Sequence, residues 1–182
     1  MVMGKSSNFP RHKHDQYRTP AKAVIPLLPL LPAGTVFAEP CAGDGALVEI
    51  LEGYGHRCVW ATDIDPQSPH VAYDDALTIR NIGADMFITN PPWTKSILHP
   101  MIDHLSSMLP CWFLFDADWP HTKQSSKLIA RCSRIVPIGR LKWIAGSAHA
   151  GLDNCCWYEF LPNHNIGPRF IGWSDDQLSL AL

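Results

Sequence analysis

The sequence predicts an α/β fold built on a mostly parallel sheet with helices on both faces. Short, almost continuously apolar strands alternate with segments of helical periodicity, which is typical of strands buried on both sides. Glycine-containing and acidic segments directly follow several of these strands, and ligands bind at the carboxyl ends of parallel strands. The 182 residues suffice for one domain with a substantial core.

The first predicted helix begins at Thr19-Pro20, a capping hydroxyl followed by a proline at the first helical position. Pro26 and Pro29 shorten or kink it. The helix expected over 46–55 has apolar residues at helical spacing and ends in glycines. Further helices are expected over 96–109 and 125–132, and strands over 34–40, 57–63, 85–90, 111–117, 133–139 and 155–161.

Composition excludes several classes of protein. No apolar run approaches the roughly 20 residues that span a bilayer, and no secretion signal precedes Ala21. The six cysteines show no zinc-ligand spacing, so we expect reduced, buried thiols and no metal. The sequence therefore predicts a cytoplasmic protein with no membrane partner. Residues 1–14 are expected to form a flexible tail and residues 15–182 a single domain.

Charge is unevenly distributed along the chain, although the net charge is only −2. Residues 39–75 contain eight acids and one base, whereas residues 119–151 contain six bases and no acid. The acidic and the basic segment indicate two different ligands. The alternative is that the charges simply lie on ordinary solvent-exposed faces of the protein. The six bases are Lys123, Lys127, Arg131, Arg134, Arg140 and Lys142.

The loop after the strand at 34–40 predicts a cationic nucleoside ligand. It reads Glu39-Pro40-Cys41-Ala42-Gly43-Asp44-Gly45 and lacks the GxGxxG dinucleotide pattern. A pyrophosphate would be repelled by Glu39 and Asp44, whereas S-adenosylmethionine carries a sulfonium and an ammonium and no phosphate. Asp63, about twenty residues on, has the placement of a ribose acceptor, and Asp75 could accept from the adenine amine of the cofactor. The alternative for each aspartate alone is a helix cap or turn.

The segment Asn90-Pro91-Pro92-Trp93 ends the strand at 85–90 and predicts a site for a planar amine. The Asn90 side-chain oxygen and the Pro91 carbonyl can accept the two amine hydrogens, which frees the nitrogen lone pair for attack. The prolines stiffen the backbone. Trp93 offers a flat surface for stacking a base, worth about 1–3 kcal/mol. The alternative is a rigid turn that carries an aromatic residue.

These motifs resemble those of the S-adenosylmethionine-dependent adenine-N6 DNA methyltransferases, and specifically small members of phage type. The resemblance covers roughly residues 15–162 and rests on Tyr17-Arg18-Thr19-Pro20, the 39–45 loop, Asp63-Ile64-Asp65-Pro66, Asp75-Ala76-Leu77 and Asn90–Trp93. It implies a Rossmann-like class I fold, with a seven-stranded, mostly parallel sheet and a reversed C-terminal hairpin at 133–139 and 155–161. Trp93 departs from the Tyr or Phe common in relatives.

The resemblance also implies roles for individual residues. The catalytic residues would be Asn90, Pro91, Pro92 and Trp93. The cofactor would contact Tyr17, Thr19, Pro20, Glu39, Cys41, Ala42, Gly43, Asp44, Gly45, Asp63, Ile64, Asp75, Ala76 and Asn90.

The expected partner is nucleic acid, with DNA first and the target base flipped into the site. Because no separate recognition domain is expected, the loops 94–96, 119–126 and 139–154 would contact the substrate. Alternative substrates are RNA bases and protein glutamine amides. A non-catalytic cofactor-binding module would have no need of Asn90, Pro91 and Pro92. The predicted substrate-binding residues are Trp93, Lys95, Trp119, Lys123, Lys127, Arg140 and Lys142.

Overall fold

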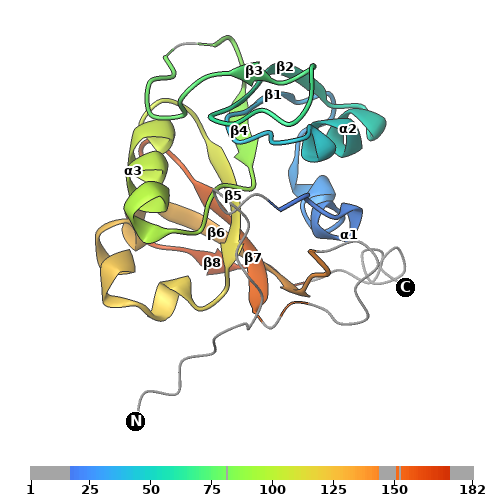
Figure 1. The fold of residues 1–182 in the computed structure, drawn as a ribbon. Coiled ribbons are helices and arrows are strands. Elements are labelled where there is room, and N and C mark those ends of the chain that lie inside the picture. Colours follow the sequence, from blue (N-terminus) through green and yellow to red (C-terminus); the bar gives the residue numbers. More distant parts are fainter. Residues whose placement is uncertain (1–16, 81, 144–150, 152, 173–182) are drawn as a thin grey trace.

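The computed structural model describes residues 17–80, 82–143, 151 and 153–172, so the predicted tail at 1–14 lies outside the described residues. Its centre is an eight-stranded sheet in the order β3-β2-β1-β4-β5-β7-β6-β8 (Figure 1). Only β7 runs antiparallel to its neighbours among these strands. The strands are β1 (Val36–Glu39), β2 (Arg57–Asp63), β3 (Ala72–Tyr73), β4 (Met86–Thr89), β5 (Cys111–Asp116), β6 (Cys132–Arg140), β7 (Asn154–Phe160) and β8 (Arg169–Phe170).

The predicted fold class is confirmed, including the reversed hairpin, which is formed by β6 and β7. The sheet has one strand more than the seven expected, because β8 adds two residues to the edge of β6. Two sets of helices cover the two faces (Figure 1). One face carries α1 (Ala21–Val24), η2 (Leu28–Leu30) and α2 (Ala46–Gly53), and the other carries α3 (Lys95–Ser106) and the short 3₁₀ helices η3 (Trp119–His121), η4 (Lys123–Lys127) and η5 (Ile129–Arg131).

The apolar side chains of β5 pack alternately against the helices on the two faces of the sheet. Trp112 and Leu114 pack in the core on the side of α1 and α2, whereas Phe113 and Phe115 pack in the core under α3. Successive side chains of a strand point to opposite faces, so a strand covered on both sides must be apolar throughout.

The first helix and a late strand are joined directly. Trp157 of β7 donates a hydrogen bond from its indole nitrogen to the carbonyl oxygen of Ala23 in α1, at 2.7 Å. Ala23, Val24 and Leu27 are fully buried in the same cluster as Trp157. Residues 23–27 are therefore part of the core.

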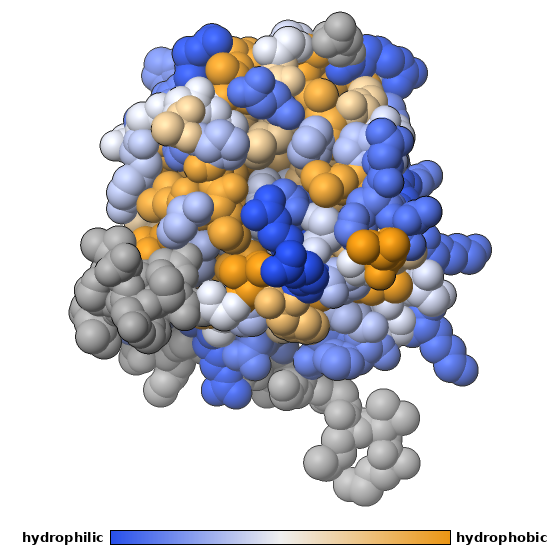
Figure 2. Space-filling view, turned by 180° about the vertical axis from the view of Figure 1, so that it is seen from behind, coloured by the Kyte–Doolittle hydropathy of each residue, from blue (hydrophilic) through white to orange (hydrophobic). Residues whose placement is uncertain are grey.

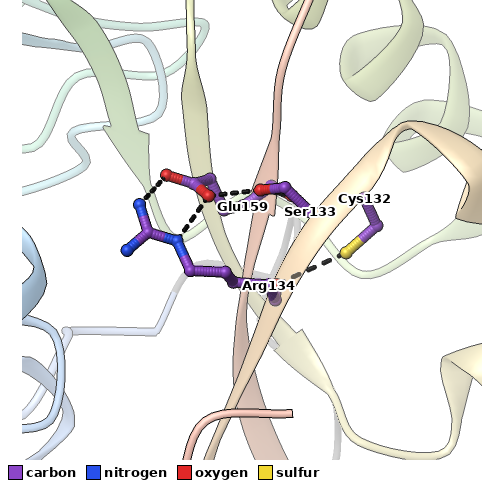
Figure 3. A network of polar contacts seen from close by, with 4 residues as sticks. All are labelled: Cys132, Ser133, Arg134 and Glu159. Carbon is purple, nitrogen blue, oxygen red and sulfur yellow. Dashed lines mark hydrogen bonds and ion pairs between the residues drawn. The ribbon is translucent and has the colours of Figure 1, made fainter. Parts of the chain in front are cut away.

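A charged network crosses β6 and β7 (Figure 3). The buried carboxylate of Glu159 accepts hydrogen bonds from the Ser133 hydroxyl and from two nitrogens of Arg134. The guanidinium of Arg134 also lies 5.1 Å from the ring centroid of Trp112. The network satisfies a carboxylate that would otherwise be costly to bury.

Two predictions of local structure are wrong, and two short strands were not predicted. Pro20, not Thr19, is the N-cap of α1 and has extended backbone angles, with no side-chain cap. No α-helix forms over 125–132, where short 3₁₀ helices occur instead. There the hydroxyls of Thr122, Ser125 and Ser126 each donate to the carbonyl three residues earlier, which competes with regular helix formation. The two-residue strands β3 and β8 were too short to leave an alternation pattern.

All six cysteines are free thiols; four are buried and two are partly exposed. Within the described residues, no group of His, Cys, Asp or Glu is arranged to bind a metal. None of the described helices has the length and apolar character needed to cross a bilayer. On the face shown in Figure 2, apolar and hydrophilic side chains are interspersed.

Candidate active site at the carboxyl edge of the sheet

A cavity of about 670 Å³ is lined by residues that follow β1, β2 and β4. Strands β1 and β4 are neighbours in the sheet, and the chain leaves β1 through α2 toward β2 but leaves β4 through α3 toward β5. The two connections diverge and open a crevice at the carboxyl edge. The volume is typical of sites for small molecules. The predicted residues that line it are Tyr17, Thr19, Glu39, Cys41, Ala42, Gly43, Asp44, Asp63, Ile64, Asp75, Ala76, Asn90 and Pro92.

Other predicted site residues lie elsewhere. Pro20, Gly45, Pro91 and Trp93 do not line this cavity. The cavity is also lined by residues to which the sequence analysis gave no role: Arg18, which lies within the 17–20 motif, and Ala46, Leu47, Gln67, Ile97 and Met101, which belong to no motif.

The glycine loop after β1 is fastened to the end of β2. Asp63 is buried, and its Oδ2 accepts a hydrogen bond from the Gly43 backbone N–H at 2.8 Å, while its Oδ1 accepts from Asp65 N–H at 2.8 Å. Gly43 and Gly45 have φ values of 53° and 87°, which glycine adopts without strain. Each carboxylate oxygen has a further lone pair, so Asp63 can both shape the loop and accept from a ligand hydroxyl.

Asp44 lies between the start of α2 and Arg18. Its Oδ1 accepts from the Ala46 backbone N–H at 3.0 Å, and its Oδ2 forms an ion pair with Arg18 at 2.5 Å. Arg18 also approaches Glu49 at 3.6 Å. The carboxylate predicted to face a cationic ligand thus already has a cationic partner at the cavity.

Glu39 is the least solvated acid of the site. It is 1% exposed, and its Oε2 has no hydrogen-bond partner in the part of the chain that the structure describes. Burial raises the pKa of Glu39 well above its ordinary value of 4.5, and the charges of Asp63 and Asp44 raise it further, while a backbone hydrogen bond from Asn90 acts in the opposite direction. A cation or donor bound in the cavity would compensate this group.

The remaining wall combines acidic and apolar groups. Asp75 Oδ1 accepts a hydrogen bond from the Leu77 backbone N–H at 2.9 Å. Ile64, which is 47% exposed, also lines the cavity. Cys41 lies 3.6 Å from Met101, sulfur to sulfur. Desolvation raises the pKa of the Cys41 thiol above its ordinary value, which disfavours the reactive thiolate at neutral pH.

Asn90 is held by the N-terminal segment. Its Nδ2 donates to the Thr19 hydroxyl at 3.2 Å and to the Tyr17 carbonyl at 3.3 Å. A carbonyl can only accept, so the amide nitrogen must face Tyr17 and the orientation of the side chain is defined. The side-chain oxygen is the atom left to accept from a ligand.

Trp93 lies beside this site and is fixed on two sides. Its indole nitrogen donates to the Leu114 carbonyl at 3.2 Å, and its ring meets Trp143 edge-on at a centroid distance of 5.6 Å. A small cavity of about 50 Å³ borders Trp93, Lys95, Leu98, Phe115, Asp116, Trp119 and Thr122. Trp119 itself is almost fully buried and donates to His99 Nε2 at 3.0 Å.

The basic segment divides into two groups. Arg131 and Arg134 form ion pairs with Asp103 and Glu159. The predicted substrate-binding cations are exposed side chains: Lys95, Lys123, Lys127, Arg140 and Lys142. Arg140 ends β6, which runs parallel to β5, so it lies at the same edge of the sheet as the cavity.

No protein-family model and no curated protein matches the sequence. The structure, however, is similar to solved methyltransferases. A candidate RNA methyltransferase from Pyrococcus horikoshii shares 17% identity and a TM-score of 0.61, over 89% of this chain and 94% of that one.

Two restriction-modification proteins are also similar. The type I methyltransferase subunit from Streptococcus thermophilus shares 11% identity with a TM-score of 0.59, and the EcoKI M protein shares 14% with a TM-score of 0.54. The matches cover 90% of this chain and 52% of each of theirs, so the chain spans about half their length. The strand order and these similarities show that the chain has the Rossmann-like fold of class I methyltransferases.

Proposed function

We propose that this chain transfers a methyl group from S-adenosylmethionine to the exocyclic N6 amine of adenine in DNA. The observation that carries the proposal is the orientation of Asn90 beside the cavity. With Nδ2 bound to Tyr17 and Thr19, its oxygen is the atom that can accept from a substrate amine. A binding module without catalysis would not require this arrangement.

The cavity suits the cofactor in charge and shape. Two of its four acids, Glu39 and Asp44, would face the cationic groups of the methionine end, and the Glu39 Oε2, buried without a hydrogen bond from the described residues, favours a donor there. Asp63 would accept from the ribose hydroxyls, and Asp75 with Ile64 would contact the cofactor adenine. S-adenosylmethionine supplies an electrophilic methyl group on a sulfonium.

The chain's own residues would prepare the attacking amine. Hydrogen bonds from the amine to Asn90 Oδ1 and the Pro91 carbonyl would withdraw the lone pair from the ring and aim it at the methyl group. No strong general base is needed, since the proton leaves after attack. Trp93 would stack on the flipped base.

The exposed cations favour a nucleic acid as substrate. Among the described residues, no acid forms an ion pair with Lys95, Lys123, Lys127, Arg140 or Lys142, in contrast to Arg131 and Arg134, so these exposed cations could bind phosphates. The restriction-modification names of two structural neighbours favour DNA. RNA is the second candidate, favoured by the neighbour from Pyrococcus horikoshii, which matches over nearly its whole length.

The test is incubation of the purified protein with methyl-labelled S-adenosylmethionine and unmethylated DNA, then RNA, followed by nucleoside analysis. We expect labelled N6-methyladenine from DNA, and a loss of at least about 100-fold in turnover for Asn90→Ala. Asn163→Ala, an exposed asparagine, serves as the control. Label in RNA alone, or in a protein amide, would replace the DNA assignment.

A further inference from the structure

Residues 17–19, here called the N-terminal strap, contact both halves of the candidate site. On one side, the Tyr17 carbonyl and the Thr19 hydroxyl accept from Asn90 Nδ2 at 3.3 and 3.2 Å. On the other, Arg18 forms an ion pair with Asp44 at 2.5 Å. The strap therefore links the glycine loop at the end of β1 to the asparagine at the end of β4.

The strap is itself held in place on both flanks. The Tyr17 ring lies 6.2 Å from the ring of Trp143, which in turn meets Trp93 at 5.6 Å. Thr19 is only 6% exposed and leads directly into α1, whose Ala23 and Val24 are fully buried. A hydroxyl on such a segment has little freedom, which makes it a suitable fixed acceptor.

We propose that Thr19 is a positioning residue for methyl transfer, acting through Asn90 and not on the cofactor. Its hydroxyl and the Tyr17 carbonyl fix the plane of the Asn90 amide, which holds Oδ1 in the direction required by the substrate amine. The inference rests on the proposed function. It assigns Thr19 a role different from contact with the methionine end of the cofactor.

The amide could not be held as well by one hydrogen bond. With the Tyr17 carbonyl alone, the side chain could turn about its terminal torsion, which has a broad energy profile. Asn90 is partly buried, so a misdirected amide would also leave a polar group poorly satisfied. The second acceptor removes this freedom before substrate binds.

The test compares Thr19→Val, which keeps the shape and removes the hydroxyl, with Thr19→Ser, which keeps the hydroxyl. We expect Thr19→Val to lower kcat about tenfold, the effect of one lost hydrogen bond. The KM for S-adenosylmethionine should stay within about twofold of the native value. Thr19→Ser should restore kcat, and Thr19→Val should add nothing to the defect of Asn90→Ala.

A structural readout accompanies the kinetics. In isotope-labelled protein, the side-chain amide resonance of Asn90, identified by its loss in Asn90→Ala, should move in Thr19→Val and not in Thr19→Ser. Unchanged kcat in Thr19→Val, a parallel loss of cofactor binding, or an unmoved resonance would each overturn the inference. A native chain that methylates no substrate would refute the proposed function and with it the role in transfer, while the resonance would still decide the geometry.

Discussion

The Oδ2 atom of Asp63 lies 2.8 Å from the backbone nitrogen of Gly43. This contact spans twenty positions of sequence and joins the ends of two neighbouring strands, β2 and β1. Because the other carboxylate oxygen accepts from Asp65 N–H, one buried side chain orders both loops that border the cavity. The residue expected to serve the ribose is thus also a structural support for the site.

Asp63→Asn should destabilise the fold and weaken cofactor binding together. The amide would turn its NH₂ toward one of the two backbone donors, which would cost about 1–3 kcal/mol of the free energy of unfolding. Urea unfolding and calorimetric titration with S-adenosylhomocysteine measure the two effects. Asp118→Asn, at an exposed position, should change stability by less than about 0.5 kcal/mol. Equal effects of the two variants would contradict the prediction.

Glu39 should make the stability of the ligand-free protein depend on pH. Its pKa in the folded state is raised above the ordinary value of 4.5 by burial and then by the charges of Asp63 and Asp44. Its contribution to stability is therefore fully present below that value and is lost as pH rises through the folded-state pKa. Glu39→Gln should be more stable than the native protein at pH 8 but not at pH 4.

Thermal unfolding of both proteins across this pH range checks the prediction. The same variant should bind S-adenosylmethionine more weakly, because it lacks the negative charge. A variant that is less stable than the native protein at pH 8 would show that Glu39 is not penalised by its burial.

The exposed lysines of η4 should control the salt dependence of nucleic-acid binding. Replacing Lys123 and Lys127 by Ala should lower the slope of log K against log salt by about one for each lysine lost from a phosphate contact. Fluorescence anisotropy with a labelled oligonucleotide measures this slope. Arg57→Ala is the matched control, since Arg57 is exposed at the start of β2, the opposite edge of the sheet. If Arg57→Ala lowered the slope equally, nucleic-acid binding could not be assigned to the lysines of η4.

The two internal ion pairs should differ in their contribution to stability. Glu159→Gln removes the partner of Arg134 in a buried network and should cost about 1.5–3 kcal/mol (Figure 3). Asp103→Asn removes the partner of Arg131, but the Asp103 side chain is 70% exposed, so the loss should stay below about 1 kcal/mol. Denaturant unfolding measures the free energy of unfolding of both variants. A larger loss for Asp103→Asn than for Glu159→Gln would contradict the prediction that the buried ion pair contributes more.

The six longer strands and the position of the candidate site could be predicted from the sequence because both have local causes. Apolar runs and the polar residues after them are visible in the chain itself, and Glu39, Asp63 and Asn90 were placed at one edge by that pattern. The ion pair of Arg18 was not predicted, although the residue lies within the 17–20 motif, because nothing in the sequence indicates that Asp44, twenty-six positions away, will lie beside it. The 125–132 segment was wrongly predicted as a helix because hydroxyls in and just before it bond their own backbone, which a hydrophobic pattern does not reveal.

The number of basic residues in 119–151 did not identify which of them could bind a substrate. All six bases of 119–151 look equivalent in the sequence, yet Arg131 and Arg134 are paired with acids from α3 and β7. Only the three-dimensional arrangement separates cations that stabilise the fold from those that remain exposed. The role of the exposed group stays a prediction that the salt titration will test.

The hydrogen bond between Trp157 and Ala23 affects how the domain can fold while it is being synthesised. The two residues are separated by 134 positions, so α1 emerges from the ribosome long before the strand on which it docks exists. Until β7 is synthesised, the apolar face of α1 can pack against α2 but lacks Trp157, so it stays partly open to chaperones and to aggregation. Folding of this domain must therefore wait until β7 has been synthesised, and α1, which directly follows the strap that holds Asn90, is docked only then.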